Sequence, residues 1–274
     1  MAETKVICFA NNKGGSGKST TCSNVGYFLA AHGSRVLLVD GDMQLNLSLS
    51  FFDEERVLAL AAGEKNLYRA LQTQADLTET ILPTPYENLD IVPSSTLMSS
   101  IEFELFSKWQ REYVFKKCLE KVRASGKYDY ILIDSPPTLG CWVMNILAAS
   151  DYLVVPVEAS PWGLFGLSNL FEFLSQAKEI APALKVAGIA VTKADGRKNY
   201  VKQTLETLQE LPAHLFSTLI HLDSNIEWAQ DGSKPVGAFR RSARSSKEYE
   251  KLAEEVAAVC PVSYTHLRAH ETLR

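Results

Sequence analysis

Residues 6–25, "VICFANNKGGSGKSTTCSNV", decide the fold of this chain. The stretch begins with a short apolar run, passes through a glycine-rich segment, and enters a helical pattern that extends to about Ala31. Glycines allow successive backbone N–H groups to point at one anion, and a helix N-terminus adds the positive end of its dipole. The order of strand, glycine loop and helix therefore predicts a phosphate-binding loop.

Residues 13–20, called the phosphate loop below, have separate expected roles. Lys18 would contact the β- and γ-phosphates of a nucleotide, and the Ser19 hydroxyl would be a ligand of Mg²⁺. A second lysine, Lys13, has no role that phosphate binding itself requires. The nucleotide contacts expected from the loop itself are Gly14, Gly15, Ser16, Gly17, Lys18, Ser19 and Thr20.

Short apolar runs alternate with helical patterns along the rest of the chain. Several runs are continuously apolar, as is typical of strands buried on both faces. The alternation predicts an α/β fold, a doubly wound, mostly parallel sheet of about seven or eight strands with helices on both faces. The expected strands are residues 5–10, 35–40, 89–94, 130–135, 152–158, 186–192 and 217–222, and the later helices are 99–125, 164–180, 199–211 and 246–259.

Length and composition limit the class of protein. The chain has 274 residues, 46% of them hydrophobic and 22% charged, which suits a globular domain with a sizeable core. We expect one domain over residues 1–260, and a tail at 261–274 that is disordered or foreign to the natural sequence. The formal net charge of -4 gives no global attraction to nucleic acid, so such binding needs a local basic patch.

The five cysteines are scattered without a CxxC pair. Their spacing fits neither a metal site nor a disulfide framework, and it favours reduced thiols inside a cell. The N-terminus does not read as a signal peptide, and no apolar stretch approaches the length of a spanning helix. We therefore expect a cytoplasmic protein.

Three aspartates follow predicted strands. Asp40 is the last residue of the run "VLLVD", and Asp42 lies in the loop that follows it. Asp134 is the last residue of "YILID", shortly before a pair of prolines. Ligands of open α/β sheets bind at the carboxyl ends of the strands. Carboxylate oxygens suit Mg²⁺ and its waters, so we expect Asp40 and Asp134 near the metal with Ser19. Asp42 lies two residues after Asp40, at the same edge of the predicted sheet.

The segment "VTKADGR", residues 191–197, ends another predicted strand. It is similar in part to the T/N-K-x-D motif with which GTPases recognise guanine. This motif alone therefore does not decide whether the nucleotide carries adenine or guanine. Asp223, after residues 217–222, is a further candidate contact to the base.

These motifs together resemble the ParA/MinD family of P-loop ATPases with a deviant Walker A loop. The phosphate loop reads K-G-G-S-G-K-S-T, and "DGDMQLN", "DSPP" and "TKADGR" are similar to the family's D-x-D-P-Q-x-N, D-x-P-P and T-x-x-D-x-R patterns. The likeness extends over about residues 5–259. It implies ATP with Mg²⁺, and a nucleotide contact for Lys13 in trans, at the phosphates of the other subunit. It also implies that Asp42 positions the attacking water, so that Lys13, Lys18 and Asp42 are the candidate catalytic residues.

The resemblance favours a ParA/Soj-like partition ATPase. That implies an ATP-dependent sandwich homodimer with slow hydrolysis, which binds nonspecific double-stranded DNA on the nucleoid. A ParB-like centromere-binding partner would trigger release, and the cycle would move a plasmid, chromosome or mobile element.

The chain departs from the family pattern at three places. Met43 replaces the proline of the second motif, Asn225 stands about where a basic residue is expected, and "SPWGLFGL" replaces a segment with a Tyr-Tyr pair. DNA would instead meet the best local basic patch of the acidic chain. This basic cluster comprises Arg240, Arg241, Arg244 and Lys247.

Alternative functions remain at this stage. A MinD-like membrane-positioning ATPase would end in a basic amphipathic helix, whereas the final predicted helix carries four glutamates (Glu248, Glu250, Glu254 and Glu255), so a membrane partner is disfavoured. A nucleotide-gated scaffold or regulator of transcription or conjugation would bind ATP with incidental turnover. A metal-cluster or reductase ATPase would need cysteines at a dimer seam, for which only Cys141 is a candidate.

Overall fold

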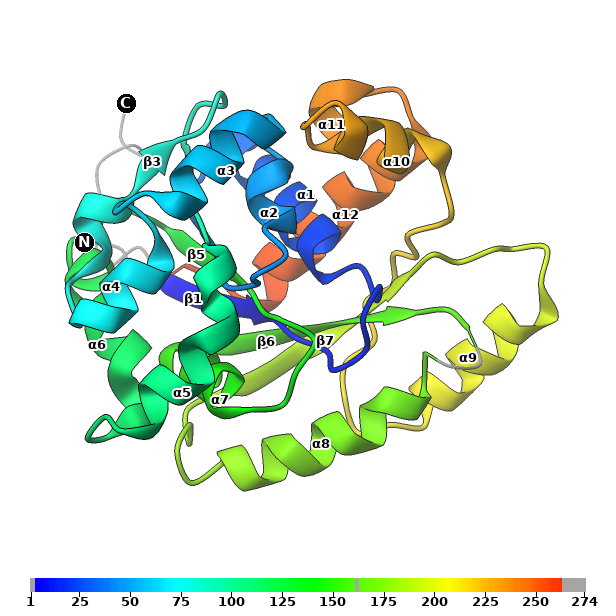
Figure 1. Cartoon of the computed structure of the whole chain (residues 1–274). Helices are drawn as coiled ribbons and strands as arrows, with labels where there is room; N and C mark the ends of the chain where they lie inside the picture. Colours follow the sequence, from blue (N-terminus) through cyan, green and yellow to red (C-terminus); the bar gives the residue numbers. More distant parts are fainter. Residues whose placement is uncertain (1–2, 161–162, 263–274) are drawn as a thin grey trace, which may run out of the picture.

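The computed structural model describes residues 3–160 and 163–262, and a seven-stranded sheet forms its centre (Figure 1). The strand order is β3-β4-β2-β5-β1-β6-β7. Neighbouring strands are parallel except for β3 and β4, which pair antiparallel at one edge. The strands are β1 (Lys5–Phe9), β2 (Val36–Asp40), β3 (Leu82–Pro83), β4 (Leu89–Val92), β5 (Tyr130–Asp134), β6 (Tyr152–Glu158) and β7 (Lys185–Thr192).

Helices cover both faces of the sheet, as the sequence predicts (Figure 1). One face packs against α1, α2, α3 and α10 to α12, and the other against α4 to α9. The helices are α1 (Lys18–Ala31), α2 (Asn46–Leu49), α3 (Glu54–Ala62), α4 (Leu67–Thr73), α5 (Ile101–Phe106), α6 (Val114–Ala124), α7 (Cys141–Ala149), α8 (Phe165–Ala177), α9 (Asn199–Gln209), α10 (Ser224–Asp231), α11 (Val236–Phe239) and α12 (Arg244–Val259). Short 3-10 turns lie at Leu77–Thr80, Thr96–Ser100 and Arg111–Tyr113.

The continuous apolar runs of the sequence are the central strands. In β1, Val6 and Cys8 belong to one core cluster while Ile7 and Phe9 belong to the other, because successive side chains of a strand point to opposite faces. Every residue of β2 and of β5 is buried. Burial on both faces explains why these strands carry no polar alternation.

The strand register brings the candidate residues to one edge of the sheet. β5 lies between β1 and β2, so Asp134 is level with Phe9 on one side and with Asp40 on the other. The phosphate loop follows Phe9 directly, and Asp42 follows Asp40. The predicted convergence of loop and carboxylates is therefore confirmed.

Two expected elements are wrong. Residues 217–222 form no regular strand of this sheet. Their second half still pairs with the end of β7, through an isolated bridge from Ala194 to His221 and through the N–H groups of Ile220 and Leu222, which donate to the carbonyls of Val191 and Ala194 at 2.9 and 3.1 Å. The Glu255 carboxylate accepts the backbone N–H groups of Ser217 and Thr218, at 2.7 and 3.0 Å, which diverts them from a strand ladder. The antiparallel edge strand β3 instead completes the seven strands.

The helix expected over residues 99–125 is broken in the middle. α5 ends at Phe106 and α6 begins at Val114, with Gln110 between them in the left-handed region at φ 51°. Phe103 and Phe106 on α5 and Trp109 in the turn after it are exposed, so this part of the expected helix does not pack into the core.

Candidate functional site

The phosphate loop connects β1 to α1, and its shape depends on its glycines. Gly15 and Gly17 have φ values of 75° and 87°, a region that other residues rarely adopt. The Thr192 hydroxyl at the end of β7 donates to the Ser16 carbonyl at 2.9 Å and holds the loop against the sheet. No side chain caps α1, and its first turn carries no acidic residue. The open helix N-terminus is therefore suited to an anion.

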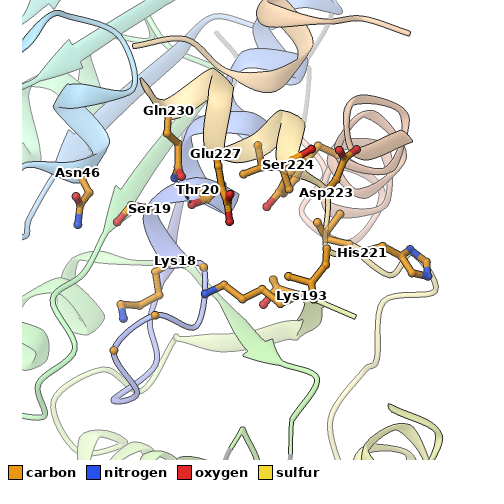
Figure 2. Close-up of a pocket in the computed structure, with 18 of the residues that line it drawn as sticks. Lys18, Ser19, Thr20, Asn46, Lys193, His221, Asp223, Ser224, Glu227 and Gln230 are labelled. Atoms are coloured by element: carbon orange, nitrogen blue, oxygen red, sulfur yellow. Dashed lines mark hydrogen bonds between the residues drawn. The ribbon is translucent and has the colours of Figure 1, made fainter. Parts of the chain in front are cut away.

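A cavity of about 610 Å³ opens in front of this loop (Figure 2). One wall carries Lys18, Ser19, Thr20 and Asp42, and the opposite wall comes from residues 220–230. Gln230 on α10 joins the walls by donating to the Thr20 hydroxyl at 2.9 Å. The sequence did not single out Gln44, Asn46, Lys193, Glu227 or Gln230 as lining residues, although the first two lie inside the motif quoted for Asp40 and Asp42.

Lys18 is nearly buried at the floor of the cavity. Its ammonium group donates to the carbonyl of Lys13 at 3.2 Å. Burial lowers the pKa of Lys18, and the carboxylates of Asp134 and Asp42 oppose that shift. A cation that lacks a direct ion pair at this point would gain from an anionic ligand.

Asp40 and Asp134 end adjacent strands, and both are fully buried. Asp40 accepts the N–H and hydroxyl of Ser48, at 2.9 and 2.6 Å, yet burial still raises the pKa of Asp40 to about 6. Neither oxygen of Asp134 accepts a hydrogen bond from the described residues. Burial and the nearby Asp40 raise the Asp134 pKa, and Ser19 and Lys18 oppose that rise.

The unpartnered Asp134 carboxylate beside Ser19 fits a hydrated cation. Among residues 3–160 and 163–262, no group of three or more histidines, cysteines, aspartates or glutamates is placed to hold a metal ion. A metal at this point would accordingly need ligands from a bound nucleotide as well, which matches Mg²⁺ carried by phosphates. Asp42 lines the same cavity and accepts the Gln44 N–H at 3.1 Å.

Comparison with known proteins identifies the family. A family model described as an AAA domain matches residues 4–186. The sporulation initiation inhibitor protein Soj of Bacillus subtilis is 36% identical over 256 residues, which cover 93% of this chain and 98% of that protein. This chain belongs to the ParA/Soj family of partition ATPases.

A second partitioning protein agrees with this assignment, and a solved structure shares the fold. The chromosome partitioning protein ParA of Caulobacter vibrioides is 32% identical over 257 residues, 92% of this chain and 93% of that protein. Among solved structures, cobyrinic acid a,c-diamide synthase from Mycobacterium smegmatis, with a bound ATP analogue and magnesium, superposes with a TM-score of 0.76. It is 26% identical, and the match covers 92% of this chain and 93% of that one.

The ParA/Soj resemblance implies that Lys13 contacts the nucleotide of the partner subunit, but in the single chain its ammonium group is hydrogen-bonded to residues of its own chain. It donates to the Glu158 carboxylate at 2.5 Å and to the Ser160 hydroxyl at 3.3 Å. Glu158 ends β6, so the pair joins the phosphate loop to the neighbouring strand. Lys13 is not among the residues that line the cavity.

The candidate base contacts differ in their placement. Asp223 lines the cavity, but its carboxylate caps α10 through the Asn225 N–H and also binds Ser245, and these bonds lower its pKa to about 2. Asp195 lies outside this cavity, and its carboxylate accepts hydrogen bonds from Nε and Nη2 of Arg197, at 2.9 and 3.2 Å. The carboxylate that would read guanine in a T-K-x-D motif is therefore already occupied.

The basic cluster is exposed on and before α12, and three of its members have partners. Arg240 donates to the Asn225 side chain at 3.0 Å, Arg241 to Glu250 at 2.8 Å, and Arg244 to the carbonyl of Leu222 at 2.8 Å. Arg240 thus places a guanidinium beside the position where the family has its basic residue. The departure at residues 160–167 includes Pro161 and Trp162, and these, like residues 263–274 of the tail, lie outside the described residues.

The cysteines agree with the reduced-thiol interpretation. All five are free, and four of them are buried. No described helix is long and apolar enough to cross a membrane.

Proposed function

We propose that this chain is an ATP-dependent dimerisation switch that hydrolyses ATP slowly and drives partition of a plasmid, chromosome or mobile element. The observation that carries the proposal is the uncapped N-terminus of α1, which opens into the cavity beside the unpartnered Asp134 carboxylate. The solved relative that holds an ATP analogue and magnesium in the same fold supports this choice of ligands.

Each residue of the site has a task in this proposal. The N–H groups of the phosphate loop and the Lys18 ammonium bind the phosphates, and Ser19 holds Mg²⁺ with Asp134 and Asp40 behind it. When bound, Mg²⁺ neutralises the charge of the phosphates. Asp42, at the cavity wall, orients the attacking water and accepts its hydrogen bond.

Lys13 has its task in the dimer. An ammonium group supplied across the interface would neutralise charge on the transferring phosphoryl group, as an arginine finger does. In the single chain, Glu158 holds this ammonium away from the cavity. Dimerisation then switches on hydrolysis because it brings Lys13 to the other subunit's nucleotide.

The central test measures ATP hydrolysis alone, with duplex DNA, and with DNA plus the candidate centromere-binding protein. We expect slow basal turnover, stimulation by the two additions together, and loss of ATP-dependent dimerisation in Lys13→Ala with nucleotide binding retained. Normal turnover in Lys13→Ala would remove the assignment of that lysine.

The basic cluster supplies the proposed DNA interface, on the nucleoid. Because Arg241 and Arg244 also contact Glu250 and Glu248, we expect moderate affinity that falls with salt. Each phosphate contact contributes about 0.9 to the log–log salt slope. Arg240→Ala/Arg241→Ala should lower that slope by up to about 2, with Lys202→Ala on α9 as a matched control. An unchanged slope would place the DNA elsewhere.

Membrane binding is the second candidate, because members of the wider family position themselves on membranes. The exposed lysines and arginines of α12 are interrupted by Glu248, Glu250 and Glu254, which does not support a basic membrane face. Sedimentation with anionic liposomes and ATP tests this, and co-sedimentation that needs ATP would favour the membrane over DNA.

A further inference from the structure

Lys193 follows the last residue of β7, and its side chain enters the cavity. Figure 2 shows its ammonium group directed toward the phosphate loop, near Lys18. The Lys193 nitrogen lies 3.8 Å from the point where a Cβ on Gly15 would stand. Lys193 is the lysine of the segment "VTKADGR", but no role was predicted for it from the sequence.

The backbone around Lys193 fixes this direction. The residue has φ 53°, in the left-handed region that residues with a side chain seldom adopt. Its neighbours are pinned on both sides, by Ala159 N–H to the Thr192 carbonyl at 2.8 Å and by Ala194 N–H to the Ile220 carbonyl at 3.0 Å. The left-handed turn therefore bends the chain between two fixed points.

The three lysines at the loop differ in their partners. Lys13 is bound to Glu158 and Ser160, and Lys18 donates to a backbone carbonyl. Within the described part of the chain, no hydrogen bond or ion pair is seen for the exposed Lys193 ammonium. Of the three lysines, Lys193 is thus the one whose ammonium group has no partner among the described residues of a single chain.

We propose that Lys193 binds the phosphate chain of the nucleotide within the same subunit. The inference rests on the proposed function, and it deepens it by naming a contact that the family motifs do not include. An ammonium beside Gly15 faces the region where the loop N–H groups and Lys18 collect negative charge. Lys193 supplies this charge in the monomer while Glu158 holds Lys13, so nucleotide loading does not wait for a second subunit.

The test uses the full chain and a fluorescent ADP analogue with Mg²⁺, and repeats the titration with a non-hydrolysable ATP analogue. Lys193→Met keeps most of the length of the side chain but removes its charge, and we expect about tenfold weaker binding of both nucleotides. Lys193→Arg should stay within about threefold of the natural chain, because it restores the cation. Lys202→Met, an exposed lysine on α9 away from the cavity, should have no effect.

The outcomes separate the inference from the proposed function. Unchanged affinity in Lys193→Met, or equal losses in Lys193→Met and Lys193→Arg, would overturn the phosphate contact. Weaker binding in Lys193→Met with recovery in Lys193→Arg, and a weaker dependence of affinity on salt, would support it. If the natural chain binds neither analogue, the proposed nucleotide switch itself fails.

Discussion

Glu158→Gln tests whether the pairing of Lys13 restrains the dimer. In the single chain, Lys13 and Glu158 form an ion pair at 2.5 Å, with side chains 25% and 28% exposed. If Lys13 must reach the partner's nucleotide, each subunit has to break this pair on dimerisation. Glutamine keeps the shape of Glu158 and removes the charge that holds the ammonium.

The magnitude follows from the exposure of the pair. An ion pair open to solvent at one quarter of its surface is screened, so we assign about 1 kcal/mol to it. A symmetric dimer breaks two pairs, which totals about 2 kcal/mol and corresponds to about a 30-fold change in the dimer dissociation constant. Glu158→Gln should therefore dimerise at about 30-fold lower concentration when ATP is saturating.

Analytical ultracentrifugation over a concentration series, with a non-hydrolysable ATP analogue, measures this constant. Because Lys13→Ala alone is expected to lose ATP-dependent dimerisation, the double variant Lys13→Ala/Glu158→Gln should dimerise no better than Lys13→Ala. A dimer constant that stays at the natural value in Glu158→Gln, or a gain that survives in the double variant, would refute this account of the pair.

Three further predictions concern the carboxylates and the backbone that places them. Asp134→Asn removes a buried carboxylate without hydrogen-bond partners, so without nucleotide it should raise the free energy of unfolding by about 1–3 kcal/mol near neutral pH. In this variant Mg²⁺ should no longer strengthen nucleotide binding. Calorimetry measures the first effect and nucleotide titration the second, and a less stable variant would contradict the first. The pKa of Asp40 is raised to about 6, so its contribution to stability is present at low pH and is lost as pH rises from about 4 to about 6. In urea unfolding, Asp40→Asn should remove up to about 3 kcal/mol of that loss of stability. Identical pH profiles of stability for the variant and the natural chain would exclude this role of Asp40. A Cβ at Gly41 would lie 2.6 Å from the Asp134 carbonyl, so Gly41→Ala should destabilise the fold by about 1–3 kcal/mol, whereas Gly196→Ala meets nothing within 4 Å and should be neutral in the same thermal melts.

Local patterns were sufficient for the parts of the fold that depend on burial and on glycine geometry. The runs at residues 130–135 and 152–158 became β5 and β6 because their side chains face apolar layers on both sides. The phosphate loop was predictable because positive φ at Gly15 and Gly17 requires glycine and because a strand and a helix flank it.

Long-range contacts set the limit of that prediction. The apolar alternation at residues 217–222 reads as a strand, but Glu255 on α12 accepts the N–H groups of Ser217 and Thr218, and no local signal shows that. The pairing of Lys13 with Glu158 joins residues 145 positions apart and was equally invisible. Lys193 was missed because its role depends on a left-handed turn between two pinned strand ends.

The cavity wall built from residues 192–249 has a consequence for chimeras within the family. The matched AAA domain ends at residue 186, yet about half of the lining residues come after it, including Gln230 and Tyr249. A fragment cut at that boundary would carry the phosphate chemistry without the opposite wall. Exchange of residues 187–260 between relatives would accordingly transplant one side of the nucleotide pocket and leave the Asp40, Asp42 and Asp134 side in place.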